Sequence, residues 1–204
     1  MVSLLTSLFP FPLTILHFTN RPAPIAPLWT VDFRASTGTG QFEFGFIDES
    51  KYSGTMAYGP ITTTGGLWTV EIAGIGAGYD DANFKPYPFQ VAFDTGTGDG
   101  QISRAVADLY WSQVEGAVWN DAWDNYLYPC TTELPDFVVQ LADGNRVGIP
   151  KEGLFWKEGD DGMCATMLGI GDSDDTLWGQ SWIEHWFVVF DWGNNRLGVA
   201  NKGQ

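Results

Sequence analysis

Asp94 begins the one stretch of this sequence whose residue types and spacing predict a catalytic group. The stretch is Asp94-Thr95-Gly96-Thr97, and it follows an apolar run, Phe89–Phe93, that predicts a strand ending at the aspartate. The Asp94 carboxylate could accept or donate a proton. Gly96 has no side chain to keep its backbone N–H from that carboxylate, and the Thr97 hydroxyl could donate to the outer carboxylate oxygen. The pattern predicts a carboxylate held at a strand end.

The elements that must position this stretch are mostly strands, because apolar residues from Leu28 onward recur with a period of two. Gln41–Phe46, for example, places three Phe on one face. Two hairpins are predicted, 136–141 with 146–149 and 186–191 with 196–200, each around a Gly/Asn turn. Helical spacing occurs at Ser103–Val114, with Ser103 as cap, and a second short helix is predicted over Ser181–His185.

Composition agrees with a packed, turn-rich β chain. The 204 residues are 44% hydrophobic and only 17% charged, with ten Trp, fourteen Phe, 25 Gly and 11 Pro. The formal net charge is -15, and there is no basic run, so neither nucleic acid nor an anionic membrane is an expected partner. An acidic surface poor in Lys and Arg suits a protein that stays soluble in acid, although any soluble acidic domain would share this composition.

Residues 1–26 differ from the rest and are set apart as an atypical segment. The stretch from Met1 to Phe18 is apolar but broken by Pro10 and Pro12, it lacks a basic start, and it is too short for a membrane span. Small residues near Ala23 and Ala26 leave a secretory signal open, and a non-native start is the other interpretation. Arg21-Pro22-Ala23-Pro24 is typical of a linker. Residues 27–204 are predicted to form the folded unit.

Several motifs, taken in order, resemble the C-terminal lobe of pepsin-like aspartic endopeptidases, especially the fungal penicillopepsin and aspergillopepsin type. No single motif carries this resemblance, but the ordered set is specific and covers roughly 27–204. The matching stretches are Pro27–Phe33, Phe44–Asp48, Lys51–Gly54, Asp94–Thr97, Tyr110–Val114, Tyr128–Cys130, Leu134–Phe137, Cys164, Leu177–Gly179, Val188–Asp191 and Arg196–Ala200.

The resemblance implies a mostly β fold, a single closed or orthogonally packed, barrel-like lobe with one or two short helices. It implies proteolysis of protein or peptide substrates with Asp94 as half of a catalytic pair, no metal or other cofactor, and a secreted or vacuolar enzyme of an acidic environment. Thr95 would hydrogen-bond across to another lobe. The element Leu177-Trp178-Gly179 would pass beneath the Asp94 loop and hold it rigid.

Cys130 and Cys164 are the two cysteines, and their spacing alone leaves pairing open. The resemblance implies that they form the disulfide of this lobe, which would indicate an oxidising compartment. On the chain-entropy model, a bridge closing a loop of this length contributes roughly 3–4 kcal/mol.

The sequence departs from the family pattern in two places near the catalytic motif. Gly98–Gln101 replaces the usual Thr or Ser and apolar run after the catalytic motif, which removes a hydroxyl and predicts a looser backbone, and Gln180 stands where the family often has Asp. The chemistry needs two carboxylates about 3 Å apart that share one proton. The sequence has one Asp-Thr-Gly; the stretch from Ser36 to Gly40 has Ser in place of Asp and predicts a turn.

Two functions stay open. The chain could act as an endopeptidase if a missing N-terminal lobe, or a second copy in a two-fold dimer, supplied the other carboxylate. It could instead be an inactive orphan lobe or peptide-binding remnant, with an exposed apolar face where a partner lobe would pack. Substrate preference is not predicted.

Other candidate sites are better explained without function. Acidic loops lack calcium-loop spacing and indicate a solvated surface; these acids are Glu158, Asp160, Asp161, Asp172, Asp174 and Asp175. His17 and His185 are isolated, so no zinc site is expected. An aromatic platform for a sugar or peptide is an alternative to packing for Trp111, Trp119 and Trp123.

Overall fold

The structure is a computed structural model that describes residues 26–34, 37–62, 66–159, 161–171 and 176–203. The atypical segment 1–26 thus lies almost wholly outside the described residues, and the boundary at 26/27 stays a prediction. The strands are β1 (Leu28–Arg34), β2 (Thr39–Phe44), β3 (Tyr52–Thr62), β4 (Trp68–Ala77), β5 (Phe84–Phe93), β6 (Gln101–Ser103), β7 (Val118–Asn120), β8 (Asn125–Pro129), β9 (Phe137–Leu141), β10 (Arg146–Ile149), β11 (Phe155–Glu158), β12 (Met163–Thr166), β13 (Gly169–Gly171), β14 (Thr176–Trp178), β15 (Trp186–Asp191) and β16 (Arg196–Lys202). The helices are α1 (Arg104–Trp111), α2 (Lys151–Leu154) and α3 (Gln180–Ile183), with 3-10 turns at Glu49–Lys51, Asp81–Asn83 and Trp192–Asn194.

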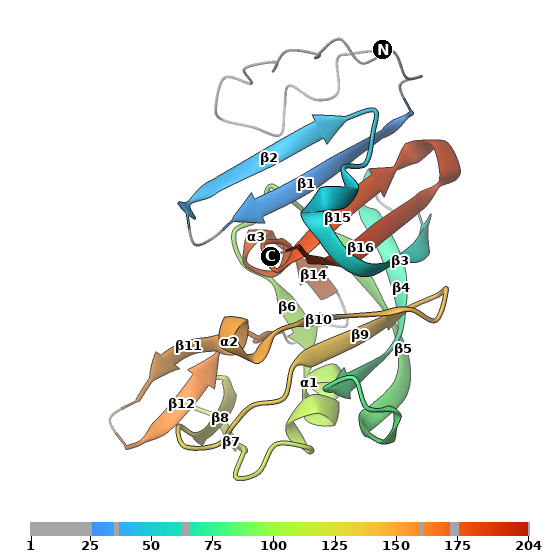
Figure 1. Cartoon of the computed structure of the whole chain (residues 1–204). Helices are drawn as coiled ribbons and strands as arrows, with labels where there is room; N and C mark the ends of the chain where they lie inside the picture. The colour runs from blue at the N-terminus through green and yellow to red at the C-terminus, as the bar shows by residue number, and fades with distance from the viewer. Residues whose placement is uncertain (1–25, 35–36, 63–65, 160, 172–175, 204) are drawn as a thin grey trace.

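Most strands belong to one 12-stranded sheet (Figure 1). Its order is β13-β6-β14-β5-β4-β3-β16-β15-β1-β2, and β9 pairs with both β4 and β10 off this path. The path has two ends, so the sheet is open rather than a closed ring. The mostly β prediction is confirmed, with three short α-helices among the described residues instead of one or two.

The main core lies between the coiled strands of this sheet and helix α1. Valines and isoleucines of β4, β9 and β15 are buried there together with several large aromatic rings. Trp178 and Trp182 stack with ring centroids 4.9 Å apart, and Trp186 and Phe93 pack beside Trp178. Phe93 and Trp178 are the last residues of β5 and β14, so this group of rings lies next to the Asp94 stretch.

The predicted hairpins form as expected. Strands β9 and β10 pair from Phe137–Ile149 to Gln140–Arg146, and β15 pairs with β16 along its whole length. Gly144 and Asn195 adopt positive φ in the two turns, which is the backbone conformation that Gly and Asn tolerate best.

The predicted helices also form, with shifted ends. Ser103 caps α1 by accepting a hydrogen bond from the Val106 N–H at 3.4 Å, and α3 begins one residue before the predicted Ser181. Helix α2 was not predicted. In the Gln41–Phe46 stretch, β2 ends at Phe44, whose side chain is 47% exposed, so this face is not uniformly buried.

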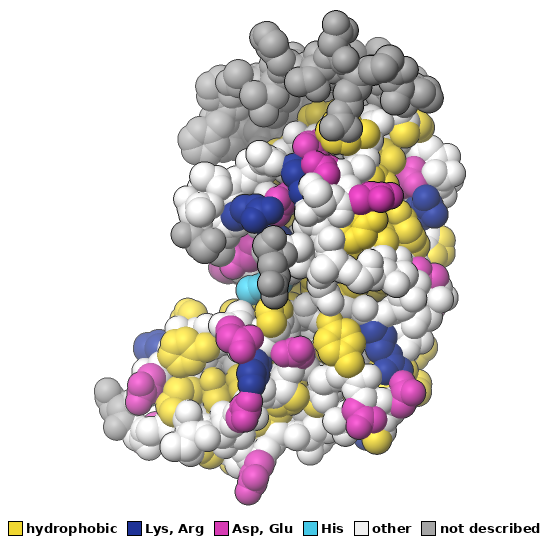
Figure 2. All heavy atoms as spheres, in the orientation of Figure 1, with side chains coloured by type: hydrophobic (Ala, Val, Ile, Leu, Met, Phe, Trp, Pro, Cys, Tyr) yellow, Lys and Arg dark blue, Asp and Glu magenta, His cyan; other side chains and the backbone are white. Residues whose placement is uncertain are grey.

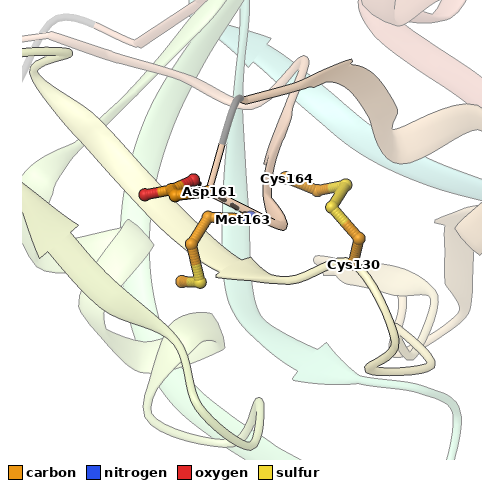
Figure 3. The surroundings of a disulfide bond; sticks show 4 residues. All are labelled: Cys130, Asp161, Met163 and Cys164. Carbon is orange, nitrogen blue, oxygen red and sulfur yellow. Dashed lines mark hydrogen bonds between the residues drawn. A yellow bond between two sulfur atoms is a disulfide. The ribbon is translucent and has the colours of Figure 1, made fainter.

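A second, 4-stranded sheet of order β11-β12-β8-β7 forms an arm at the lower left of Figure 1. We call it the arm. The disulfide between Cys130 and Cys164 joins the chain just after β8 to β12, with Cα atoms 5.1 Å apart (Figure 3). The predicted pairing of the two cysteines is therefore confirmed.

Of the described helices, none has both the length and the apolar character that crossing a membrane requires.

Candidate active site

Asp94 lies immediately after β5, which is held on both sides. Strand β5 pairs antiparallel with β4 and parallel with β14, where Trp178 is opposite Phe93. The Asp94 N–H then donates to the Trp178 carbonyl oxygen at 3.0 Å. The predicted strand that ends at the aspartate is thus present, and its last backbone bond fixes where the carboxylate begins.

Both oxygens of the Asp94 carboxylate accept hydrogen bonds from its own loop. The Gly96 N–H donates to Oδ1 at 2.8 Å, and the Thr97 hydroxyl donates to Oδ2 at 2.8 Å. A Cβ added at Gly96 would lie only 3.2 Å from Oδ1, so a side chain there would crowd the carboxylate. Two donors on two oxygens fix the plane of the carboxylate.

The segment that follows β14 holds the Asp94 loop through three hydrogen bonds. The N–H groups of Gln180 and Ser181 donate to the carbonyl oxygens of Thr97 and Gly98, at 2.7 and 2.9 Å. The Gln180 side chain also donates to the Thr95 carbonyl oxygen at 3.0 Å. Three of the loop's carbonyls therefore have partners in one short segment at the start of α3.

Gly179 is the point of closest approach between the two segments. A Cβ added there would lie 2.0 Å from the Asp99 carbonyl oxygen and 2.4 Å from that of Thr97. Only glycine fits this position. Leu177 and Trp178 precede it on β14, and Trp178 is buried. The structure thus brings together all the predicted site residues, 94–97 and 177–179, around one loop.

The departures at Gly98–Gln101 have different consequences. Gly98 is exposed, and a Cβ there would meet nothing within 4 Å. Gly100 instead lies against Trp182, since its Cβ would be 2.4 Å from the indole ring. Hydrogen bonds from the segment after β14 and the Trp182 contact hold this loop, and the looser backbone stays a prediction.

Sequence reasoning missed three contacts of the site. The Gln180 side chain, at a position where the sequence departs from the family pattern, donates to the Thr95 carbonyl oxygen. Neither the Ser181 N–H bond to Gly98 nor the stacking of Trp182 on Trp178 was predicted. Trp178 ends β14 and Trp182 lies on α3, so their stacking joins two elements across Gly179 and no helical spacing signals it.

Asp94 has no acidic partner in the part of the chain that the structure describes. The groups that hydrogen-bond its carboxylate there are Gly96 and Thr97. Buried Asp32 is a separate site, since it accepts from Lys202 and Arg34, each at 2.8 Å. Burial alone would raise the pKa of Asp32, but these two cations outweigh burial and lower it.

The remaining candidates do not form a site among the described residues. No group of three or more His, Cys, Asp or Glu that could hold a metal occurs in ranges 26–34, 37–62, 66–159, 161–171 and 176–203. His185 is mostly buried, and burial together with nearby Lys202 lowers its pKa to about 4. Gly38 has φ 61, as a turn requires. His17, Ser36, Asp160, Asp172, Asp174 and Asp175 lie outside the described residues.

The three tryptophans of the aromatic-platform prediction do not form one surface. Trp111 is buried in the core. Trp119 is covered by the Arg104 guanidinium, which lies 3.5 Å above its ring. Trp123 alone of the three is exposed.

Comparison with known proteins agrees with this geometry. A family model described as eukaryotic aspartyl protease matches residues 24–202. Aspergillopepsin-1 of Aspergillus oryzae is 31% identical over 194 residues, covering 94% of this chain and 47% of that relative. Penicillopepsin-1 of Talaromyces stipitatus is 33% identical over 163 residues, covering 79% of this chain and 41% of that relative. The chain thus spans about half the length of the curated relatives it matches.

A solved structure supports the fold independently. The crystal structure of the aspartic proteinase from Irpex lacteus matches with a TM-score of 0.69 at 22% identity, covering 88% of this chain and 57% of that one. The predicted pepsin-like fold is therefore confirmed. Since the family model also covers nearly all the described residues, this chain belongs to the eukaryotic aspartyl protease family.

Proposed function

We propose that this chain supplies one of the two carboxylates of an aspartic-type endopeptidase, and that Asp94 is that carboxylate. The observation that carries the proposal is the fixed carboxylate, with a backbone N–H on one oxygen and a hydroxyl on the other. Family membership supports the reaction class. The relatives are about twice as long as this chain, so a second carboxylate would come from the half that this chain does not match.

Peptide hydrolysis of this kind divides its work between two acids. Two carboxylates about 3 Å apart share one proton, because both cannot ionise at that distance. The ionised one removes a proton from a bound water, and the protonated one polarises the scissile carbonyl. Gly96 and Thr97 would hold Asp94 in the plane that this exchange requires. The Thr95 hydroxyl would bond to the partner lobe while Gln180 holds the Thr95 backbone.

One copy of the chain cannot do both jobs, since Asp94 alone cannot be both base and acid. Removing one member of a cooperating catalytic unit usually abolishes nearly all of its benefit. The second carboxylate would come from an N-terminal lobe or from a second copy across a two-fold axis. If neither is present, the chain is an inactive lobe that still offers a peptide-binding surface, which is the second candidate function.

The proposed location is outside the cell or in a vacuole, in an acidic environment. A disulfide indicates an oxidising compartment. The net charge of -15 falls as the pH drops, because carboxylates are protonated, and this lowers the self-repulsion that opposes the compact state in acid. The proposed substrate is a protein or peptide.

Complementation tests the proposal. The chain would be co-expressed with the upstream half of Aspergillus oryzae aspergillopepsin-1, and hydrolysis of an internally quenched peptide would be measured at acidic pH. We expect the combination to hydrolyse the peptide, and Asp94→Asn to lower that activity by about 1000-fold or more. The matched control is Asp99→Asn, an exposed carboxylate of the same loop, which should keep activity. Equal activity with Asp94→Asn would refute the assignment.

A further inference from the structure

Three large aromatic side chains of the arm are exposed. Trp156 is 59% exposed, Phe155 53% and Trp123 37%. Figure 2 shows hydrophobic side chains gathered over β11 and β12 at the lower left of the molecule. Large apolar side chains that cluster on a surface usually mark a binding site, because their exposure to water is unfavourable.

The two indole rings are held in place without any ligand. The Asn120 side chain accepts hydrogen bonds from the Ala122 and Trp123 N–H groups, at 3.0 and 3.1 Å, and so fixes the turn after β7. Trp123 and Trp156 meet edge to face with centroids 6.3 Å apart. The Lys157 ammonium lies 4.8 Å from the Trp123 ring centre and 5.9 Å from that of Trp156, which adds a cation–π attraction to both.

A small cavity adjoins Trp123. Its volume is about 250 Å³, and it lies between the turn after β7 and the turn between β11 and β12. It is lined by Asn120, Trp123, Leu127, Gly159, Asp161 and Met163. Asp161 uses Oδ1 to accept from the Met163 N–H at 3.2 Å, as Figure 3 shows at this hairpin. The cavity thus combines an indole wall with an amide and a carboxylate.

We propose that this cavity and the two adjoining rings bind a neutral pyranose unit of a polysaccharide. The C–H face of a pyranose stacks on an indole ring, and its hydroxyls donate to carboxylates and accept from amides. The volume is below the roughly 300–1,000 Å³ of pockets for drug-sized ligands, which suits one sugar ring better than a longer peptide segment. An anionic sugar is disfavoured by Asp161 in the wall and by the chain's net charge of -15.

The proposed site is independent of the Asp94 chemistry. It is built from β7, β8, β11 and β12, which form a sheet separate from the one that carries Asp94. Its role would be to hold the protein on a polysaccharide surface. The disulfide braces it, since the bridge joins the end of β8 to β12 within the same sheet.

Affinity electrophoresis of the full chain tests the site. Native gels would contain hydroxyethylcellulose, laminarin or no polysaccharide, and cellohexaose and laminarihexaose would serve as competitors. Retardation in at least one of the two polysaccharides is expected, with an apparent Kd that rises at least tenfold in Trp123→Ala and Trp156→Ala. The matched control is Trp192→Ala, which removes a 61% exposed indole outside the arm and should bind as the wild type does. Far-UV circular dichroism would verify that each variant is folded.

Three results would overturn the proposal. The first is wild-type mobility unchanged in both polysaccharides. The second is equal weakening in the Trp192→Ala control, which would mean that general surface stickiness causes the retardation. The third is displacement by a decapeptide or by heparin but not by the neutral hexasaccharides, which would assign the patch to a peptide or an anionic ligand.

Discussion

Gly179→Ala is the most informative perturbation of the loop that carries Asp94. Its Cβ would lie 2.0 Å from the Asp99 carbonyl oxygen, whereas real Cβ contacts essentially never fall below 3.0 Å. The backbone must therefore move by about 1 Å at this point. Because the obstacle is backbone and not a flexible side chain, the move must stretch the Gln180 bond to Thr97 as well.

The expected cost of Gly179→Ala follows from this overlap. Forcing extra volume into a packed site costs about 1–3 kcal/mol, and each kcal/mol lowers Tm by roughly 2–4 °C in a domain of this size. A displacement of 1 Å in a catalytic group can cost about 100-fold in rate. In the complemented enzyme, kcat should therefore fall further than the stability loss alone explains.

The assay compares Gly179→Ala with Gly98→Ala. A Cβ at Gly98 meets nothing within 4 Å, so this variant changes the same loop without an overlap. Thermal unfolding and amide hydrogen exchange of residues 94–100 would be measured for both. We expect lower Tm and faster exchange for Gly179→Ala alone. If both variants matched the wild type, the close approach of β14 to the loop would be wrong.

Three other perturbations test separate parts of the fold. Replacing Cys130 and Cys164 by Ser should lower the free energy of unfolding in urea by about 3–4 kcal/mol, because the bridge closes a loop with a sequence separation of 34; an unchanged midpoint would contradict this. Burial and Lys202 lower the pKa of His185 from 6.5 to about 4, so its stabilising contribution is complete above pH 6.5 and is lost as the pH falls towards 4. Between pH 7 and pH 4.5 this loss lowers the free energy of unfolding by roughly 2–3 kcal/mol. Urea unfolding at both pH values should show the loss in the wild type and not in His185→Gln. Asp32→Ala leaves the Lys202 ammonium half-buried without its carboxylate and should cost about 3 kcal/mol by the same assay, with a loss below 1 kcal/mol refuting a stabilising role.

The strand framework could be predicted because its signals are local. The hairpin of β9 and β10 combines alternating residues with an Asp143-Gly144-Asn145 turn, and the structure has both. Ser103 stands before a helical apolar pattern and caps α1. Contacts within the 94–97 stretch were equally predictable, since they join residues at most three positions apart.

Long-range packing could not be predicted from the sequence alone. Helix α2 has four residues and contains Gly153, so it shows no helical period. Helix α2 packs against His185 at Gly153, because a Cβ at Gly153 would lie 2.4 Å from the imidazole. The Gln180 contact to Thr95 likewise joins residues 85 positions apart. Such contacts depend on how β14 and α3 lie beneath the loop, and no local pattern encodes them.

The same limit applied to the aromatic residues. Trp111, Trp119 and Trp123 are close in sequence, but the fold buries the first, covers the second with Arg104 and exposes the third. The ring that Trp123 meets is Trp156, from a strand more than thirty residues later. Sequence proximity therefore does not predict which tryptophans share a surface.

We propose that one copy of the chain provides a single catalytic carboxylate. Sedimentation velocity combined with an acid peptidase assay on the same purified sample measures this directly. We expect that the monomer cleaves no peptide, and that any activity sediments with a dimer and disappears in Asp94→Asn. A monomer that hydrolyses the peptide substrate would contradict it.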